Sequence, residues 1–383
     1  MKTTAEVIII GAGVIGTSIA YNLAKAGCHE VLVLEKDIIG GGSTSKAAGG
    51  VRQQFSTEVN ISLSIESITF FQNFEDEIGH PVDLRQCGYL FLFCTEQDGE
   101  RFRQNVALQR SLGVKVELLS PKEVKDIIPK LNTEDVLGAT YCPTDGIVDP
   151  HSVVQGFASA ARKLGVRICQ DTEVIDISMS KGKRVRGVLT NSGEVAAPIV
   201  VDAAGPYAGQ VGKMAGLDIP IRPNKQQVFF SAPSNEIQKD APFIIDVSTG
   251  FGFRRERQVL MLQVRDEEAP EGFDTNIDWG YLWRVGEIMV HRLPFLENVG
   301  IMRAQAGLHE DSPDGSAILG QVSEIEGLYL ACGLSGHGVM HSPAVGRLMA
   351  EYILGKESGL TISALSLSRF KEGERFQSFK TFI

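Results

Sequence analysis

The chain contains near its N-terminus the segment Val7-Ile8-Ile9-Ile10-Gly11-Ala12-Gly13-Val14-Ile15-Gly16. Four β-branched residues that end in glycine are typical of a buried parallel strand. The apolar pattern from Val14 to Ala26, with Gly27 as a C-cap, predicts a helix, and Val31 to Leu34 predict a second strand. Strand, glycine turn, helix and strand together form a βαβ unit, which predicts a Rossmann-like α/β fold.

The glycines of this turn each have a physical role in binding a dinucleotide. Gly11 permits the tight turn, Gly13 lets the backbone approach a pyrophosphate, and Gly16 permits close packing of helix on strand. The start of the helix offers N–H donors and a favourable dipole to phosphates. Glu35, nineteen residues after Gly16, can accept hydrogen bonds from ribose hydroxyls, which favours a dinucleotide without a 2′-phosphate. The motif alone leaves open whether the dinucleotide is FAD or NAD.

Similar signatures lie in the middle and near the end of the chain. Ile199 to Asp202 predict a buried strand, and so do Leu328 to Ala331, which precede a glycine turn and a helix from Ala344 to Leu354. Alternating apolar and polar residues from Arg222 to Gln263 predict an antiparallel sheet. We therefore expect an α+β chain in which a Rossmann-like domain of residues 1–85, 143–220 and 300–383 is interleaved with an antiparallel-sheet substrate domain of residues 86–142 and 221–299.

Other segments give simpler predictions. A helix is expected over Glu58 to Glu77, a strand over Val166 to Val174, a hairpin around Asn191-Ser192-Gly193, and a helix over Trp279 to His291.

Composition narrows the class of protein. A length of 383 residues favours two domains, and the net charge of −10 argues against non-specific binding to nucleic acid or anionic membranes. The six scattered cysteines form no CxxC pair, so we expect reduced thiols, a cytoplasmic location and no metal site. The uncharged stretch from Val7 to Ala24 has the length of a membrane span, but a nucleotide fold produces the same profile, and we expect no span.

The ordered motifs of the chain resemble the FAD-binding set of the D-amino-acid-oxidase superfamily. Beside the βαβ unit, the resemblance rests on Gly41 to Ser45, Thr172 to Val174, Val201 to Pro206 and Gly333 to Met340. Within that superfamily the chain is most similar to sarcosine oxidase β-subunits and the β-subunit of dye-linked L-proline dehydrogenase. The segments that indicate this branch are Gly50 to Phe55, Gln86 to Leu92, Pro143 to Gly146, Ser312 to Gly315 and Gly336 to Gly346.

The resemblance implies a non-covalent FAD. Some family members attach FAD through a cysteine seven residues before the aspartate of a Pro-Asp turn, and this chain has Gly307 at that position. The implied FAD-binding residues are Gly11, Ala12, Gly13, Val14, Ile15, Gly16, Glu35, Lys36, Gly42, Ser43, Thr44, Ser45, Val174, Ala204, Gly205, Gly333, Gly336, His337, Gly338, Val339 and Met340.

The implied reaction is oxidation of a secondary or N-methyl amino acid such as sarcosine or proline. Hydride passes from the carbon beside nitrogen to flavin N5, and an imine results. Arg52 would bind the substrate carboxylate, and the alternative role for Arg52 is a surface salt bridge. His337, Met340 and His341 are the other candidate catalytic residues. A glycine- or D-amino-acid-type oxidase and a non-catalytic electron-relay subunit remain alternatives.

Several residues leave alternatives open. His151 matches a position that carries FMN in heterotetrameric sarcosine oxidases, but a plain helix-start histidine is the favoured interpretation. For Arg254, Arg255 and Arg257 a solvated charge cluster is the favoured interpretation, and the alternative is that one of them faces the substrate pocket. His291 and His309 are interpreted as structural or exposed. The stretch from Arg257 to Arg265 holds no lysine, which predicts slow reaction with oxygen and transfer of electrons to a second subunit or an acceptor protein.

Overall fold

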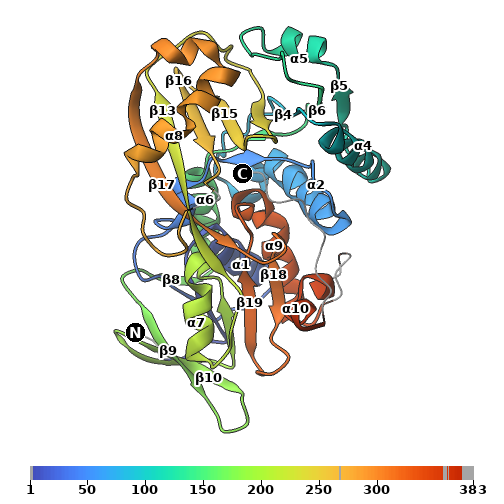
Figure 1. Cartoon of the computed structure of the whole chain (residues 1–383). Helices are drawn as coiled ribbons and strands as arrows, with labels where there is room; N and C mark the ends of the chain where they lie inside the picture. Colours follow the sequence, from blue (N-terminus) through green and yellow to red (C-terminus); the bar gives the residue numbers. More distant parts are fainter. Residues whose placement is uncertain (1–2, 267–268, 357–359, 361, 373–383) are drawn as a thin grey trace.

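The computed structural model describes residues 3–266, 269–356, 360 and 362–372 (Figure 1). Its first sheet has six strands, in the order β18 (Ile318–Gln321), β19 (Leu328–Cys332), β12 (Ile199–Asp202), β1 (Val7–Ile10), β2 (Val31–Leu34) and β8 (Arg167–Cys169). All neighbouring pairs are parallel except β18 with β19. The carboxyl ends of five strands therefore meet at one edge, as expected for a doubly wound nucleotide fold.

Both faces of this sheet are covered, which is why its strands are apolar throughout. Along β1, Val7 and Ile9 belong to the core on one side, while Ile8 and Ile10 belong to the core on the other. Helix α1 (Val14–Lys25) packs on the first side against α6 (Pro150–Lys163) and α9 (Gly338–Ile353), and α2 (Glu58–Gln72) packs on α9. The second side is covered by α7 (Ala208–Met214) and a sheet of β9 (Val174–Met179), β10 (Val185–Thr190) and β11 (Gly193–Ala196).

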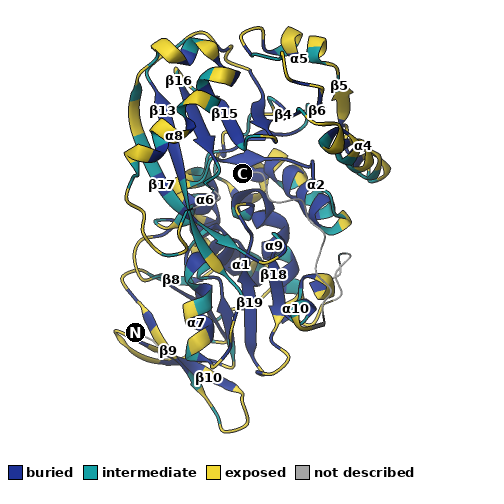
Figure 2. Cartoon of the chain, in the orientation of Figure 1, coloured by how far each residue is buried: buried dark blue, intermediate teal, exposed yellow. Residues whose placement is uncertain are grey.

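A second large sheet lies beyond the first, in the upper part of Figure 1. Its order is β17 (Ile301–Asp311), β13 (Arg222–Ser231), β16 (Val259–Val264), β15 (Phe251–Glu256), β14 (Phe243–Asp246), β4 (Tyr89–Phe93), β6 (Gly138–Cys142) and β5 (Glu117–Leu119). All pairs are antiparallel except β14 with β4. The helical elements of this region are α4 (Glu96–Ser111), α5 (Pro121–Ile127), α8 (Trp279–Arg292) and η3 (Pro294–Asn298), and the outer faces of α4, α5 and α8 are exposed (Figure 2).

Two connections join the first sheet to the second. The short ribbon of β3 (Gly50–Val51) and β7 (Gly146–Ile147) pairs segments that are distant in sequence. Strand β17 belongs to the second sheet but also contacts η1 (Ser43–Lys46) and η2 (Gly205–Tyr207) of the first region. Sheet membership therefore groups residues 301–311 with the second sheet, although they follow the boundary predicted at residue 300. The exact division into domains stays a prediction.

Most predicted elements are confirmed, including the first βαβ unit and the hairpin at Asn191-Ser192-Gly193. Three predictions are wrong in their bounds. The helix expected over Glu58 to Glu77 is interrupted at Asn73, where α2 ends and α3 (Phe74–Ile78) begins. The strand expected over Val166 to Val174 is two strands in different sheets, β8 and β9, because the chain turns between them at Asp171, where φ is +52°.

The helix expected from Ala344 instead begins at Gly338 and contains Pro343. Proline has no N–H, so the carbonyl of Val339, four residues earlier, loses its helical donor. The hydroxyl of Ser342 donates to this carbonyl at 2.8 Å and replaces the missing bond. A proline that usually marks a helix boundary is therefore tolerated inside α9.

The C-terminal described part forms η4 (Ile362–Leu365) and α10 (Arg369–Glu372). None of the helices in the described ranges is long and apolar enough to cross a membrane. The uncharged N-terminal stretch is instead β1, the glycine turn and the 12-residue helix α1. All six cysteines are free thiols.

Candidate active site

Three turns meet at the carboxyl edge of the six-stranded sheet. Strands β1, β12 and β19 are neighbours and parallel. The segments that follow them, Gly11 to Gly13, Ala203 to Gly205 and Gly333 to Gly336, consequently lie along the same edge. In open α/β sheets this edge is where nucleotide ligands bind. The structure thus brings together most of the predicted FAD-binding residues.

The first turn has no room for side chains at two of its glycines. Gly11 has φ of +102°, and a Cβ there would lie 2.6 Å from the carbonyl oxygen of Ala203. A Cβ on Gly16 would lie 2.0 Å from the carbonyl oxygen of Gly11. The backbone is therefore drawn closely against the neighbouring strand end and the helix start, as the sequence motif predicts.

The start of α1 is available to an anion. Its N-cap, Gly13, has no side chain to cap the helix, and the first turn holds no acidic residue. The Val14 N–H donates to Thr44 Oγ1 at 3.2 Å, so Thr44 of the predicted Gly42 to Ser45 loop is part of this turn. The remaining first-turn N–H groups and the helix dipole favour a phosphate at this position.

Glu35 lies beside the same turn at the end of β2. Its Oε2 accepts from the Ala12 N–H at 2.8 Å, and its Oε1 accepts from the Asp37 N–H at 2.9 Å. Each carboxylate oxygen still has a lone pair for a ribose hydroxyl. The neighbouring Lys36 is exposed, and its ammonium lies 3.2 Å from the ring centroid of Tyr207.

The loop before β3 is attached to β17. Ser43 Oγ donates to the carbonyl of Leu308 at 2.7 Å, while Ser45 Oγ donates to the carbonyl of Gly42 at 2.9 Å. A Cβ on Gly307 would lie 2.6 Å from the Cβ of Lys46. The position of the cysteine that binds FAD in some family members is therefore closely packed by this loop.

Two buried carboxyl groups near the second turn have unpaired oxygens. Asp202 Oδ1 accepts from the Ala204 N–H at 3.1 Å, but Oδ2 has no partner in the described part of the chain. Glu310 Oε1 accepts from the Leu334 N–H at 3.3 Å, and its Oε2, 3.7 Å from a Cβ placed on Gly205, is likewise unpaired. Burial raises the pKa of Asp202 to about 8 and that of Glu310 to about 7.

These orphaned oxygens fit a ligand with hydroxyl groups or phosphates. A protonated carboxyl group can donate a hydrogen bond, which an ionised one cannot. Buried polar atoms are almost always paired in proteins, so unpaired ones call for a missing partner. Together with the close glycine turn and the open helix start, they show that the residues present fit a bound dinucleotide. Val174, by contrast, contributes its side chain to the apolar core below the sheet.

The third turn has an unusual backbone. Gly333, Ser335 and Gly336 have φ of +70°, +51° and +88°. A left-handed conformation costs little for glycine but is unfavourable for serine. The turn ends at His337, the N-cap of α9, whose first turn carries no acidic residue. Gly338, Val339 and Met340, which the resemblance implied as FAD-binding residues, form the first turn of α9 and present N–H groups, while the Met340 side chain lies in the apolar core.

Arg52 is buried without a counter-charge. Its side chain is 6% exposed and donates to the Gln54 carbonyl at 2.8 Å. No carboxylate among the described residues forms an ion pair with it, and its Nε has no hydrogen-bond partner. Its guanidinium carbon lies 4.1 Å from the ring centroid of Phe55 and 5.3 Å from that of Phe91. The prediction of a surface salt bridge as the alternative role is therefore wrong.

His337 is the second polar neighbour of Arg52. Its Nε2 lies 3.1 Å from Arg52 Nη2. An arginine can only donate, so Nε2 is the acceptor and the ring carries its proton on Nδ1. Burial, assisted by the positive charge of Arg52, lowers the pKa of His337 well below its usual range. His337 is consequently neutral and adds no charge to the site.

His341 lies one turn further along α9 and is also neutral. Its Nε2 is 2.8 Å from Ser64 Oγ, which donates its own hydrogen to the Asn60 carbonyl at 2.9 Å. Ser64 must therefore accept, and His341 carries its proton on Nε2. Burial and the charge of Arg52 lower the pKa of His341 to about 3. Phe55 contacts both histidines, with its ring centroid 4.9 Å from that of His337 and 5.1 Å from that of His341.

Sequence reasoning missed the residues that support Arg52. Asp145 is fully buried and accepts from the backbone N–H of Gln53 at 2.9 Å and from the side-chain amide of Gln54 at 3.1 Å. Burial raises the pKa of Asp145 to about 6 despite these bonds. The Pro-Thr-Asp-Gly turn that contains Asp145 was visible in the sequence, but no local pattern indicates that this turn contacts the segment of Arg52.

The other candidate residues are separate from this group. His151 is exposed at the start of α6, so its proposed link to FMN stays a prediction. Arg254 and Arg255 are buried, which corrects the interpretation of these two as solvated, whereas Arg257 is exposed. Arg254 donates to the Ala48 carbonyl at 2.9 Å. His309 is half-buried against Gly336, where a Cβ would lie 2.7 Å from its ring.

Comparisons with known proteins agree with this arrangement. The family model described as FAD dependent oxidoreductase (DAO) matches residues 6–352. The chain is 32% identical to FAD-dependent oxidoreductase domain-containing protein 1 of Bos taurus, over 97% of this chain and 86% of that protein. It is 28% identical to mitochondrial sarcosine dehydrogenase of Homo sapiens, over 97% of this chain but only 42% of that longer protein.

Solved structures give the same family of folds. L-proline dehydrogenase from P.horikoshii superposes with a TM-score of 0.92 and 32% sequence identity, covering 98% of this chain and 100% of that one. Glycine oxidase from Geobacillus kaustophilus superposes with a TM-score of 0.85 and 27% identity, covering 96% of this chain and 99% of that one. The predicted fold class and the predicted superfamily are confirmed.

Proposed function

Because the chain belongs to the family of FAD-dependent oxidoreductases, we propose that it oxidises a secondary or N-methyl amino acid of the sarcosine or proline kind. The relatives named sarcosine dehydrogenase and L-proline dehydrogenase support this substrate class. The observation that carries the proposal is Arg52, a buried guanidinium that forms no ion pair with a carboxylate in the described part of the chain. A substrate carboxylate would supply the missing negative charge.

Arg52 is suited to hold a carboxylate in one orientation. Its guanidinium has five N–H donors in a planar fork, of which the Gln54 carbonyl and His337 occupy two. Phe55 and Phe91 stabilise the cation through their ring faces but leave its charge available. A bidentate bond to the carboxylate would fix the direction of the bond between carbon and hydrogen beside nitrogen.

Burial and the charge of Arg52 favour the reactive form of the substrate. Oxidation needs a nitrogen lone pair, so the amine must lose its proton. A buried site disfavours the charged ammonium, the nearby Arg52 repels it, and the neutral His337 and His341 add no charge of either sign. FAD, held at the three turns, would supply the two-electron acceptor for the hydride. The chain's own contribution is to bind, orient and desolvate the substrate.

We further propose that the electrons go to a second subunit or an acceptor protein. A cation beside the flavin is what stabilisation of superoxide would require. The stretch from Arg257 to Arg265 holds no lysine, and Arg265 forms an ion pair with Asp311 at 3.2 Å. The charge of Arg265 is therefore partly neutralised, which supports slow reaction with oxygen. The glycine oxidase structure keeps a peroxide-forming oxidase as the alternative.

The test compares substrates that differ only in the carboxylate. FAD-loaded protein is mixed anaerobically with L-proline or pyrrolidine, and with sarcosine or dimethylamine, while flavin bleaching is followed. The proposal expects bleaching by at least one amino acid and a rate at least about 100-fold lower for its carboxylate-free partner, because a site built for a polar group rejects the analogue that lacks it. Bleaching by neither amino acid would contradict the proposal and favour an electron-relay subunit.

Reaction with air then separates the two kinds of enzyme. Reduced protein that reoxidises slowly in air but rapidly with an artificial dye supports a dehydrogenase. Rapid reoxidation in air with formation of hydrogen peroxide would contradict electron transfer to an acceptor protein. Glycine serves as a third substrate, because preference for glycine over sarcosine would favour the oxidase alternative.

A further inference from the structure

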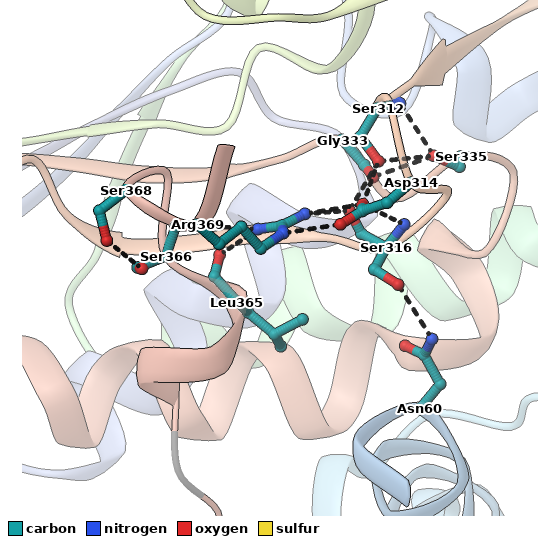
Figure 3. A network of polar contacts seen from close by, with 10 residues as sticks. All are labelled: Asn60, Ser312, Asp314, Ser316, Gly333, Ser335, Leu365, Ser366, Ser368 and Arg369. Atoms are coloured by element: carbon teal, nitrogen blue, oxygen red, sulfur yellow. Dashed lines mark hydrogen bonds and ion pairs between the residues drawn. The ribbon is translucent and has the colours of Figure 1, made fainter. Parts of the chain in front are cut away.

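A buried ion pair joins the C-terminal helix to the region of the third turn (Figure 3). The side chains of Arg369, in α10, and Asp314 are 2% and 1% exposed. Arg369 Nε and Nη2 donate to the two carboxylate oxygens at 2.9 and 3.0 Å. Arg369 also donates to the carbonyls of Leu365, Ser366 and Ser316. This pair ties α10 to the segment from Ser312 to Ser316.

One branch of the network reaches the third turn. The Ser312 N–H donates to Ser335 Oγ at 3.1 Å, and Ser335 Oγ donates to the Gly333 carbonyl at 3.1 Å. Asp314 also accepts from the Ser316 N–H at 3.1 Å, which closes the turn on which Ser312 lies. Ser335 has the unfavourable φ of +51°. A strained residue persists only where its surroundings hold it, and these bonds supply that restraint.

A second branch reaches the histidine side of the site. Ser316 Oγ accepts from the Asn60 side-chain amide at 3.3 Å. The Asn60 carbonyl accepts from Ser64, which in turn accepts from His341 Nε2 at 2.8 Å. Figure 3 shows Asn60 directed at Ser316 from the opposite side to Arg369. Hydrogen bonds therefore connect α10 with both the glycine turn and the ring of His341.

We propose that Arg369 is a positioning residue, which through Asp314 holds the Gly333 to Gly336 turn in the conformation that binds FAD. The inference rests on the proposed FAD site at this turn. Arg369 lies 33 residues after Gly336 in sequence, yet it is the charged side chain of the described C-terminal residues that is buried and connected to this turn. Groups that orient a binding site from outside are commonly required for its affinity.

The test measures FAD binding to the apoprotein of the full chain. Arg369→Met is expected to weaken FAD affinity about tenfold or more, in the range found for residues that support binding groups. Arg369→Lys keeps the positive charge but not the bidentate geometry, so its FAD affinity should lie between that of the native chain and that of Arg369→Met. The matched control is Lys371→Met, which removes a charge from the same helix where the side chain is 61% exposed and pairs with Glu324. This control should change affinity less than about twofold.

Hydrogen exchange of the apoprotein distinguishes this role from a general loss of stability. In Arg369→Met we expect faster exchange confined to residues 333–341, with α1 and β1 unchanged, whereas a general loss of stability would also speed exchange in α1 and β1. An Arg369→Met protein with native FAD affinity and native exchange at these residues would overturn the inference.

A second variant tests the inference if Arg369→Met does not fold. Ser335→Ala cuts only the branch to the turn and leaves the ion pair intact. Its FAD affinity should fall about fivefold or more, because the two hydrogen bonds of the Ser335 hydroxyl are lost, and unchanged affinity would overturn the inference. A native chain that binds no flavin at all would instead contradict the proposed function, so the two failures are distinguishable.

Discussion

The molecule buries an arginine in two regions that treat its charge differently. At the end of α8, Arg292 is 1% exposed and donates to Asp246 of β14 at 2.7 Å and to Asp135 at 2.8 Å. Beside the third turn, Arg52 is 6% exposed and is surrounded by a carbonyl, a neutral histidine and two aromatic rings, and no carboxylate among the described residues forms an ion pair with it. Within the described part of the chain, one buried arginine thus has carboxylate partners and the other has none.

This difference indicates which of the two regions binds a ligand. A buried charge is costly unless an opposite charge compensates for it. For Arg292 the fold supplies two aspartates, so the region is complete by itself. For Arg52 the fold supplies aromatic rings, whose attraction does not neutralise the charge, so a carboxylate from outside would complete the region.

The largest expected effect is on stability in the paired region. Arg292→Met leaves Asp246 buried without a counter-charge, so the free energy of unfolding should fall by about 3 to 5 kcal/mol. Arg52→Met should cost no more than about 1 kcal/mol, because removal of an uncompensated charge offsets the loss of two hydrogen bonds. Urea denaturation of the two variants measures both values. Equal losses would remove the distinction between the regions.

The next effect is on activity, and here the larger loss is expected for Arg52 and not for Arg292. Arg52→Met should lower kcat/KM for the preferred amino acid by about 100- to 1,000-fold, the cost of an unpaired buried carboxylate. The same variant should leave the slow reaction with the carboxylate-free amine nearly unchanged. Stopped-flow flavin reduction measures both rates. A uniform loss for both substrates would mean that Arg52 does not act through the carboxylate.

These predictions depend on a contrast that the sequence revealed only in part. The turn of Gly11, Gly13 and Gly16, with Glu35, could be predicted because its geometry is set by neighbouring residues and a fixed spacing. Arg52 and His337 were candidates, but their contact joins residues 285 positions apart. The role of Asp145 depends on the pairing of β3 with β7, which no local pattern indicates.

A third prediction concerns Asp145, the carboxylate that acts on Arg52 without forming an ion pair with it. Its pKa in the folded protein is about 6, whereas an exposed aspartate has a pKa of about 4. The folded state therefore binds the proton more tightly, so this group lowers the free energy of unfolding as the pH rises from about 4 to about 6, by about 2 to 3 kcal/mol in total.

Asp145→Asn removes that pH dependence. Relative to the native chain, the variant should gain about 2 to 3 kcal/mol between pH 4 and pH 7. Denaturant unfolding at a series of pH values measures the difference. A constant difference across this range would show that Asp145 has an ordinary pKa and that the region of Arg52 is more polar than its burial indicates.

The smallest expected effect concerns Phe55, one of the two aromatic residues whose rings contact Arg52. Phe55→Leu keeps an apolar side chain but removes the ring face 4.1 Å from the guanidinium. Substrate affinity should fall about two- to fivefold, because a cation–π contact contributes about 0.5 to 1 kcal/mol. The dissociation constant of an unreactive amino acid measures the change. Tighter binding in Phe55→Leu would show that the ring obstructs the carboxylate.

The most direct measurement is the binding of an unreactive carboxylate to the FAD-loaded protein. Pyrrole-2-carboxylate and pyrrole differ only in the carboxylate, and a change in the flavin absorption spectrum reports binding of either. The native protein should bind pyrrole-2-carboxylate and not pyrrole, and Arg52→Met should bind neither. If Arg52→Met binds pyrrole-2-carboxylate as tightly as the native protein does, Arg52 is not the carboxylate receptor.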